Sequence, residues 1–218
     1  MRRQFLVPAA MIAAVLMLAA CAPAAPAPAP TSSATMTSAP SPEPTAQAQL
    51  ELTVDGLHLL VGDEEKSAGF DDAAAVLALL EQATGTLPEP TPVDDLPGYD
   101  MNLVNYTWAG LTLVADETGT GFARIIVSDS SIDGVPIATP EGVTVGSTRD
   151  ELVSAGAADV WNQGDVATAG ELGLGMREVA DTNSLANPGT PGVEFLMFTL
   201  DGDTVSAIHA PADDFSDL

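Results

Sequence analysis

The sequence predicts an α+β fold in which two loosely repeated units each combine one helix with an antiparallel β-hairpin. Three observations support this prediction. Leu50, Leu52 and Val54 alternate with polar residues, as in a half-buried strand. Residues 70–85 (FDDAAAVLALLEQATG) place apolar side chains at helical spacing. Asp201-Gly202 separates two apolar runs, which is a strong hairpin signal.

The first unit is expected to span residues 50–128. Its first strand is interrupted at Asp55-Gly56 and resumes beyond that turn. Its helix is expected to begin after a capping Asp71 or Asp72 and to end at Gly85. A loop rich in proline and aspartate should follow over 86–100, and three strands should complete the unit over 104–108, 111–115 and 122–127.

The second unit is expected to span residues 129–218. A strand at 135–137 precedes a short helix, because Thr148 and Glu151 have capping-box spacing. The glycines at 170, 173 and 175 do not form a dinucleotide-binding fingerprint and are interpreted as a flexible or bulged loop. The hairpin at Asp201-Gly202 closes the chain, so both units share the order of strand, helix and hairpin.

The segment GVTVGSTRDEL (142–152) resembles a sequence motif that is common in exported actinobacterial proteins. The element order over residues 50–210 resembles the β-lactamase-inhibitor-protein-like fold, in which tandem units of helix and antiparallel sheet form a concave binding surface. This resemblance brings no catalytic residues with it, and similarity of fold alone does not establish a function.

The N-terminus has the form of a secretory signal over residues 1–20, with Arg2 and Arg3 before an apolar run. The run ends in Leu18-Ala19-Ala20-Cys21, which resembles the lipobox of bacterial lipoproteins. The resemblance implies that the Cys21 sulfur is diacylated and anchors the protein to the cell membrane on its extracytoplasmic face. The alternative is an ordinary cleaved signal of a secreted protein.

Residues 21–49 are expected to form a disordered linker. They are rich in alanine, proline, serine and threonine, contain no aromatic residue and carry one charge, Glu43. Such a composition cannot bury a hydrophobic core. We interpret the segment as a stalk between the membrane and the folded part.

The chain is strongly acidic, with 31 acidic and 6 basic residues and a formal charge of −25. It therefore lacks the basic surface that nucleic acid requires as a partner. The acidity can serve solubility alone, or it can form an acidic binding surface.

The sequence offers no catalytic motif, cofactor motif or metal motif. Ser147 is explained by capping, and His58 and His209 lie in apolar strand contexts as structural histidines. Two histidines and one cysteine do not suffice for a zinc cage. The acidic groups Asp94-Asp95, Asp201-Gly202-Asp203 and Asp213-Asp214 with Asp217 lack calcium-loop spacing; the second is interpreted as a turn and the last as a solvated tail.

Three aromatic residues are the candidates for a binding surface: Tyr106, Trp108 and Trp161. Core packing is the alternative role for each of them. The function favoured by the sequence is a surface-tethered lipoprotein with a non-catalytic extracytoplasmic binding domain. The alternatives are an exported hydrolase with carboxylate catalysis and a purely structural component of the cell envelope.

Overall fold

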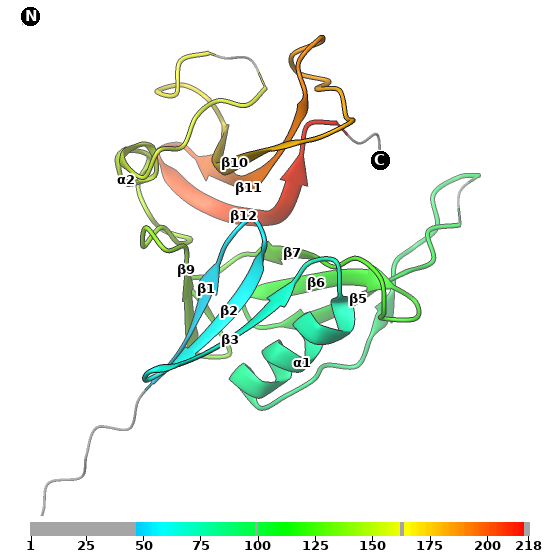
Figure 1. Cartoon of the computed structure of the whole chain (residues 1–218). Coiled ribbons are helices and arrows are strands. Elements are labelled where there is room, and N and C mark those ends of the chain that lie inside the picture. Colours follow the sequence, from blue (N-terminus) through cyan, green and yellow to red (C-terminus); the bar gives the residue numbers. More distant parts are fainter. Residues whose placement is uncertain (1–46, 99, 162–163, 216–218) are drawn as a thin grey trace, which may run out of the picture. The chain divides into compact units, whose positions relative to one another are not determined.

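A computed structural model describes residues 47–98, 100–161 and 164–215 (Figure 1). The lipobox, Cys21 and the predicted linker up to residue 46 lie outside the described residues. The described chain starts with a strand at Ala48. Ala48 and Gln49, predicted as the end of the linker, therefore belong to the first strand.

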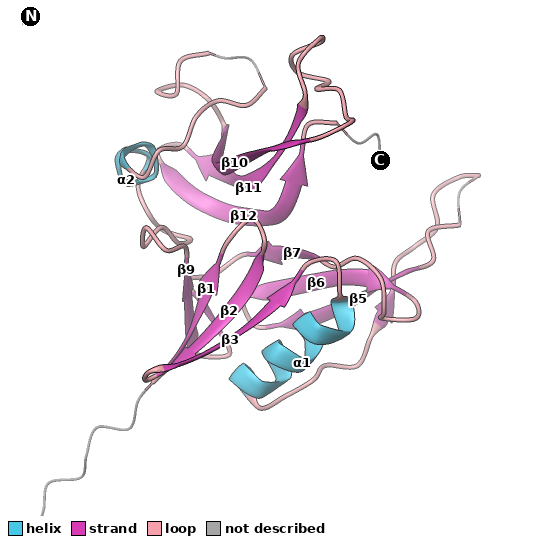
Figure 2. Ribbon diagram, in the orientation of Figure 1, coloured by secondary structure: helices cyan, strands magenta, loops and turns pink. Residues whose placement is uncertain are grey.

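The predicted α+β fold of two helix-plus-hairpin units is wrong, because the described chain is mostly β-sheet, with 44% in strands and 11% in two helices (Figure 2). One sheet has five strands in the order β3-β2-β1-β9-β8, and the other has seven in the order β10-β11-β12-β7-β6-β5-β4. The five-stranded sheet contains β1 (Ala48–Leu52), β2 (Gly56–Val61), β3 (Glu64–Gly69), β8 (Ser131–Ile132) and β9 (Val135–Ala138). The seven-stranded sheet contains β4 (Thr91–Pro92), β5 (Leu103–Trp108), β6 (Leu111–Asp116), β7 (Arg124–Val127), β10 (Glu171–Val179), β11 (Gly192–Asp201) and β12 (Thr204–Asp213).

Strand pairing explains why the chain does not divide into repeats. β1 pairs with β9 in parallel, with Leu50 opposite Ile137. β12 pairs with β7 in antiparallel register, with Ile208 opposite Val127. Each sheet therefore joins strands from both of the predicted units, and the hydrophobic core continues across them.

The first helix, α1 (Ala73–Thr84), forms as the sequence predicts. The Asp72 carboxylate accepts a hydrogen bond from the Ala75 amide, and Gly85 ends the helix in the left-handed region at φ 77°. The apolar face packs against β1, β2 and β3 (Figure 1). Ala73, Val76 and Leu80 are fully buried. Burial of a large apolar side chain such as Val76 or Leu80 stabilises the fold by about 1.5–3 kcal/mol.

The second helix, α2 (Arg149–Ser154), confirms the predicted capping box. The side chain of Thr148 accepts from the Glu151 amide, and Glu151 accepts from the Thr148 amide at 2.7 Å. Arg149 is buried and donates to the Asp203 carboxylate at 2.8 Å and to backbone carbonyls of the 166–169 loop and of Gly202. The guanidinium charge is therefore satisfied, and it fastens α2 to the β11–β12 turn.

The prediction of a loop around Gly173 and Gly175 is wrong, because both glycines lie in strand β10. Gly173 exchanges two backbone hydrogen bonds with Ala158, and a Cβ atom at Gly173 would lie 2.6 Å from a methyl group of Val160. The register of β10 on β11 shifts between Leu174 and Arg177. Gly175 takes φ 71° at this bulge, where glycine is favoured.

The C-terminal acidic residues do not form a solvated tail. Asp214 is 2% exposed and accepts hydrogen bonds from the Ser184 hydroxyl and from the Val193 amide at 2.7 Å. Its backbone carbonyl also accepts from the Leu185 amide at 2.7 Å. Asp214 therefore fastens the end of the chain to the loop between β10 and β11, whereas Asp217 lies outside the described residues.

Candidate functional site

The three aromatic candidates occupy different environments. Trp108 is 4% exposed, and its indole N–H donates to the Thr86 carbonyl at 3.0 Å. Tyr106 is half-buried and packs against the same core. Trp161 is half-buried and lines a groove. The structure thus separates Trp161 from the pair on β5, and Trp108 belongs to the core.

The groove beside Trp161 has a volume of about 430 Å³ and combines apolar and polar side chains. We call it the Trp161 groove. It is lined by Asp159, Trp161, Ala169, Gly170, Glu171, Thr199 and Leu200. These residues come from the loops on either side of residues 162–163 and from the paired strands β10 and β11.

Asp159 positions Trp161. Its carboxylate accepts from the Trp161 amide at 3.0 Å and from the Gly164 amide at 3.1 Å. The indole also meets the buried ring of Phe195 edge to face, with centroids 5.9 Å apart and planes at 76°. The aromatic ring at the groove is therefore held both by its own loop and by the sheet core.

The indole N–H of Trp161 is buried and has no hydrogen-bond partner among the described residues. An unsatisfied buried donor costs about 1–3 kcal/mol. A phenylalanine would supply an aromatic ring without this cost. Nothing among the described residues compensates this N–H, and a buried polar group without a partner calls for an explanation.

Glu171 and Thr199 form the sheet side of the groove, where they lie opposite each other across β10 and β11. The adjoining wall is fixed by backbone contacts. The Leu200 amide donates to the Gly170 carbonyl at 2.8 Å, and Arg149 donates to the Ala169 carbonyl at 2.7 Å. No hydrogen bond of the Glu171 side chain is found among the described residues, although its charge acts on His209 of β12. Its carboxylate is thus available to a ligand.

Sequence reasoning missed Glu171 and Thr199. Leu172 and Leu174 alternate with glycines rather than with polar residues, so the stretch does not show the usual strand pattern. β10 takes the end position of the seven-stranded sheet because it pairs with β11, and this pairing joins segments that are distant in sequence.

Both histidines lie outside the groove lining. His209 is half-buried in β12 between Met197 and Ile126. Burial lowers the pKa of His209, which the charge of Glu171 partly offsets and the charge of Arg124 lowers further. His58 Nδ1 lies 2.8 Å from a carboxylate oxygen of Glu65 on β3.

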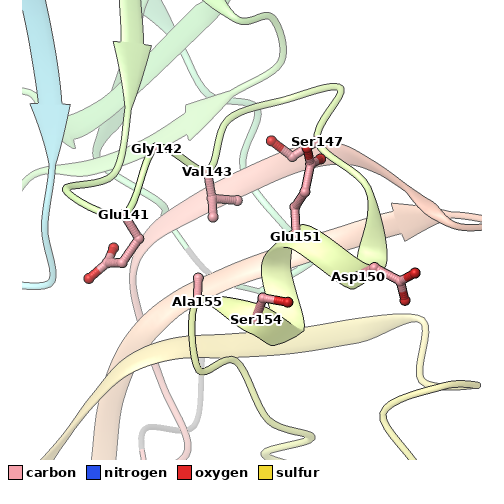
Figure 3. A pocket seen from close by; sticks show the side chains of 8 residues that line it. All are labelled: Glu141, Gly142, Val143, Ser147, Asp150, Glu151, Ser154 and Ala155. Carbon is pink, nitrogen blue, oxygen red and sulfur yellow. The ribbon is translucent and has the colours of Figure 1, made fainter.

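Another hollow lies beside α2, with a volume of about 580 Å³ (Figure 3). Ser147 and Glu151 lie close together in it, whereas Glu141 and Asp150 point to opposite sides (Figure 3). Glu151 is engaged in the capping box, and the Ser147 hydroxyl accepts from the Thr144 amide at 3.0 Å. Glu151 therefore belongs to the helix cap, whose N-cap residue is Thr148, and Ser147 closes the turn before it instead of capping the helix.

A third hollow of about 320 Å³ contains Phe122 and Arg177. Arg177 donates to both Asp55 and Glu194. The hydrogen bond to Glu194 is the main cause of the raised pKa of the guanidinium. Arg177 of β10 therefore links Asp55 in the β1–β2 turn to Glu194 of β11.

Within the described ranges, no group of three or more histidine, cysteine, aspartate and glutamate side chains is placed to hold a metal ion. In the same part of the chain, neither helix is long and apolar enough to cross a membrane. Comparison with protein-family models, curated proteins and solved structures finds no match.

Proposed function

We propose that the protein is a lipoprotein, anchored through Cys21 on the extracytoplasmic face of the cell membrane, whose folded part binds a ligand in the Trp161 groove without catalysis. The N-terminal sequence supports the anchor, and the composition of the linker supports a stalk. One observation supports the binding role above all. The indole N–H of Trp161 has no partner among the described residues, and the side chain lines a groove together with the carboxylate of Glu171.

The two carboxylates of the groove have different roles. Hydrolysis by a carboxylate pair needs both groups to face the reacting bond. Asp159 accepts two backbone N–H groups of its own loop, so it positions Trp161. Glu171 is left to contact a ligand. This division favours binding over the alternative of an exported hydrolase.

Cosedimentation with envelope fragments from the producing cells tests the proposal. The soluble variant Cys21→Ser should sediment with the fragments, and adding Trp161→Ala should abolish this. Met176→Ala is the matched control, because Met176 is 44% exposed on β10 and does not line the groove. Equal sedimentation of the Trp161→Ala variant, or none of the parent, would contradict the proposal.

A further inference from the structure

We infer that the ligand of the Trp161 groove carries an organic cation, an ammonium or guanidinium group that lies against the indole and is neutralised by Glu171. The inference rests on the proposed function and names the chemical class of its ligand. Tryptophan, a carboxylate and the charge of the chain each support it.

The choice of tryptophan is the first support. A phenylalanine at residue 161 would avoid the buried N–H that has no partner among the described residues. Among aromatic side chains, tryptophan attracts cations most strongly through its ring face. Binding of a cation to the ring face would account for an indole at this position.

The carboxylate is the second support. Asp55 and Glu194 in the Phe122 hollow and Glu151 beside α2 accept hydrogen bonds from the protein. Glu141 and Asp150 have none among the described residues, but the hollow beside α2 that they line contains no aromatic side chain. Glu171 likewise has no hydrogen bond among the described residues, and it shares its groove with Trp161. Taken with the ring, it supplies the opposite charge that an ammonium group requires when it leaves water.

The overall charge is the third support. A chain with a formal charge of −25 repels anions and attracts cations toward its surface. The groove volume of about 430 Å³ suits a small ligand or the end of one side chain. A free amine and a lysine or arginine side chain of a partner protein present the same chemistry.

Two probes of the same shape separate charge from size. The full chain with Cys21→Ser and Trp108→Phe keeps Trp161 as its one tryptophan, since the sequence has two. Titration with choline should change the Trp161 fluorescence saturably. The uncharged analogue 3,3-dimethylbutan-1-ol should bind at least about tenfold more weakly. A tetralysine peptide, compared with choline, distinguishes a protein side chain from a free amine as the source.

Calorimetry on variants that all keep Trp108 tests whether choline binds in the Trp161 groove. Glu171→Gln should weaken choline binding about tenfold, whereas Glu178→Gln, the same charge change at an exposed residue of β10, should leave it unchanged. Trp161→Phe should weaken binding severalfold and leave the melting temperature unchanged or raised. A purely structural tryptophan would instead lower the melting temperature.

Equal binding of choline and its uncharged analogue, absence of choline binding, or equal effects of Glu171→Gln and Glu178→Gln would overturn the inference. If envelope fragments still bind in a Trp161-dependent manner in that case, the proposed function stands and the ligand is not a cation. If Trp161→Ala leaves sedimentation unchanged, the proposed function itself fails.

Discussion

Replacing Trp108 by alanine tests the interpretation of β5 as a core strand. Trp108 is 4% exposed and lies opposite Leu111, which is 1% exposed, at the end of the β5–β6 hairpin. Truncation of a buried tryptophan to alanine costs about 3–5 kcal/mol through lost burial and a residual cavity.

The hydrogen bond of Trp108 adds little to this cost. Its acceptor, the Thr86 carbonyl, belongs to an exposed residue. Water can therefore replace the indole N–H in the variant, so no buried acceptor is left unsatisfied. For a folded part of this size, about 1 kcal/mol corresponds to 2–4 °C, so the melting temperature should fall by about 6–20 °C.

Thermal unfolding followed by far-ultraviolet circular dichroism measures this shift. Trp108→Phe is the control, because it keeps a ring in the core and should lose much less. A shift of about 2 °C or less for Trp108→Ala would refute the buried environment of this residue and return β5 to the candidates for a binding surface.

Three further predictions concern the anchor, the C-terminal contact and acid stability. Cys21→Ser, made together with Trp161→Ala so that groove binding does not retain the protein, should move it from washed membranes to the soluble fraction; retention of this double variant in membranes would contradict the lipobox. Asp214→Ala should lower the free energy of unfolding by about 3–6 kcal/mol in urea titrations, because Ser184 and Val193 each lose a charged acceptor; an unchanged urea midpoint would refute this. Folding lowers the pKa values of His209, Glu151 and Asp116 from their unfolded values of 6.5, 4.5 and 3.8. The contribution of each group to the free energy of unfolding is therefore complete above its unfolded pKa and is lost as the pH falls through its folded pKa. Stability should therefore decline from about pH 6.5 downward, and His209→Gln should remove the first part of that decline in urea titrations at stepped pH.

Local signals in the sequence predicted the elements that depend on neighbouring residues. The caps of α1 and α2 and the turn at Asp201-Gly202 each arise within a few residues of chain, and the structure confirms them. The alternation at Leu50 and Leu52 also identified β1. These features need no information about distant contacts.

The elements that were missed depend on pairing between distant segments. β3 begins with three charged residues, Glu64, Glu65 and Lys66, and is a strand because it extends the edge beside β2. β10 is held by β11 and by the bridge from Gly173 to Ala158. Counting helices and hairpins without these strands made the chain resemble two α+β units.

The candidate site was predictable only in part. Trp161 stood out as a rare aromatic residue, but the sequence could not separate its environment from that of Trp108. Glu171 was hidden because its role depends on which carboxylates already have partners, as Asp214 and Glu151 do. Partner assignments of this kind arise only from the three-dimensional arrangement.

The position of β12 has a consequence for the time at which the protein can fold. As the last strand of the described residues, it lies between β11 and β7 and pairs residues 208–210 with residues 125–127. Contacts between distant segments carry a high loop-closure entropy and slow folding. A chain that crosses a membrane N-terminus first would hold β7 without this neighbour until residues 204–213 emerge. The seven-stranded sheet could close only after that point, so β7 would stay exposed to proteases and chaperones until β12 has crossed.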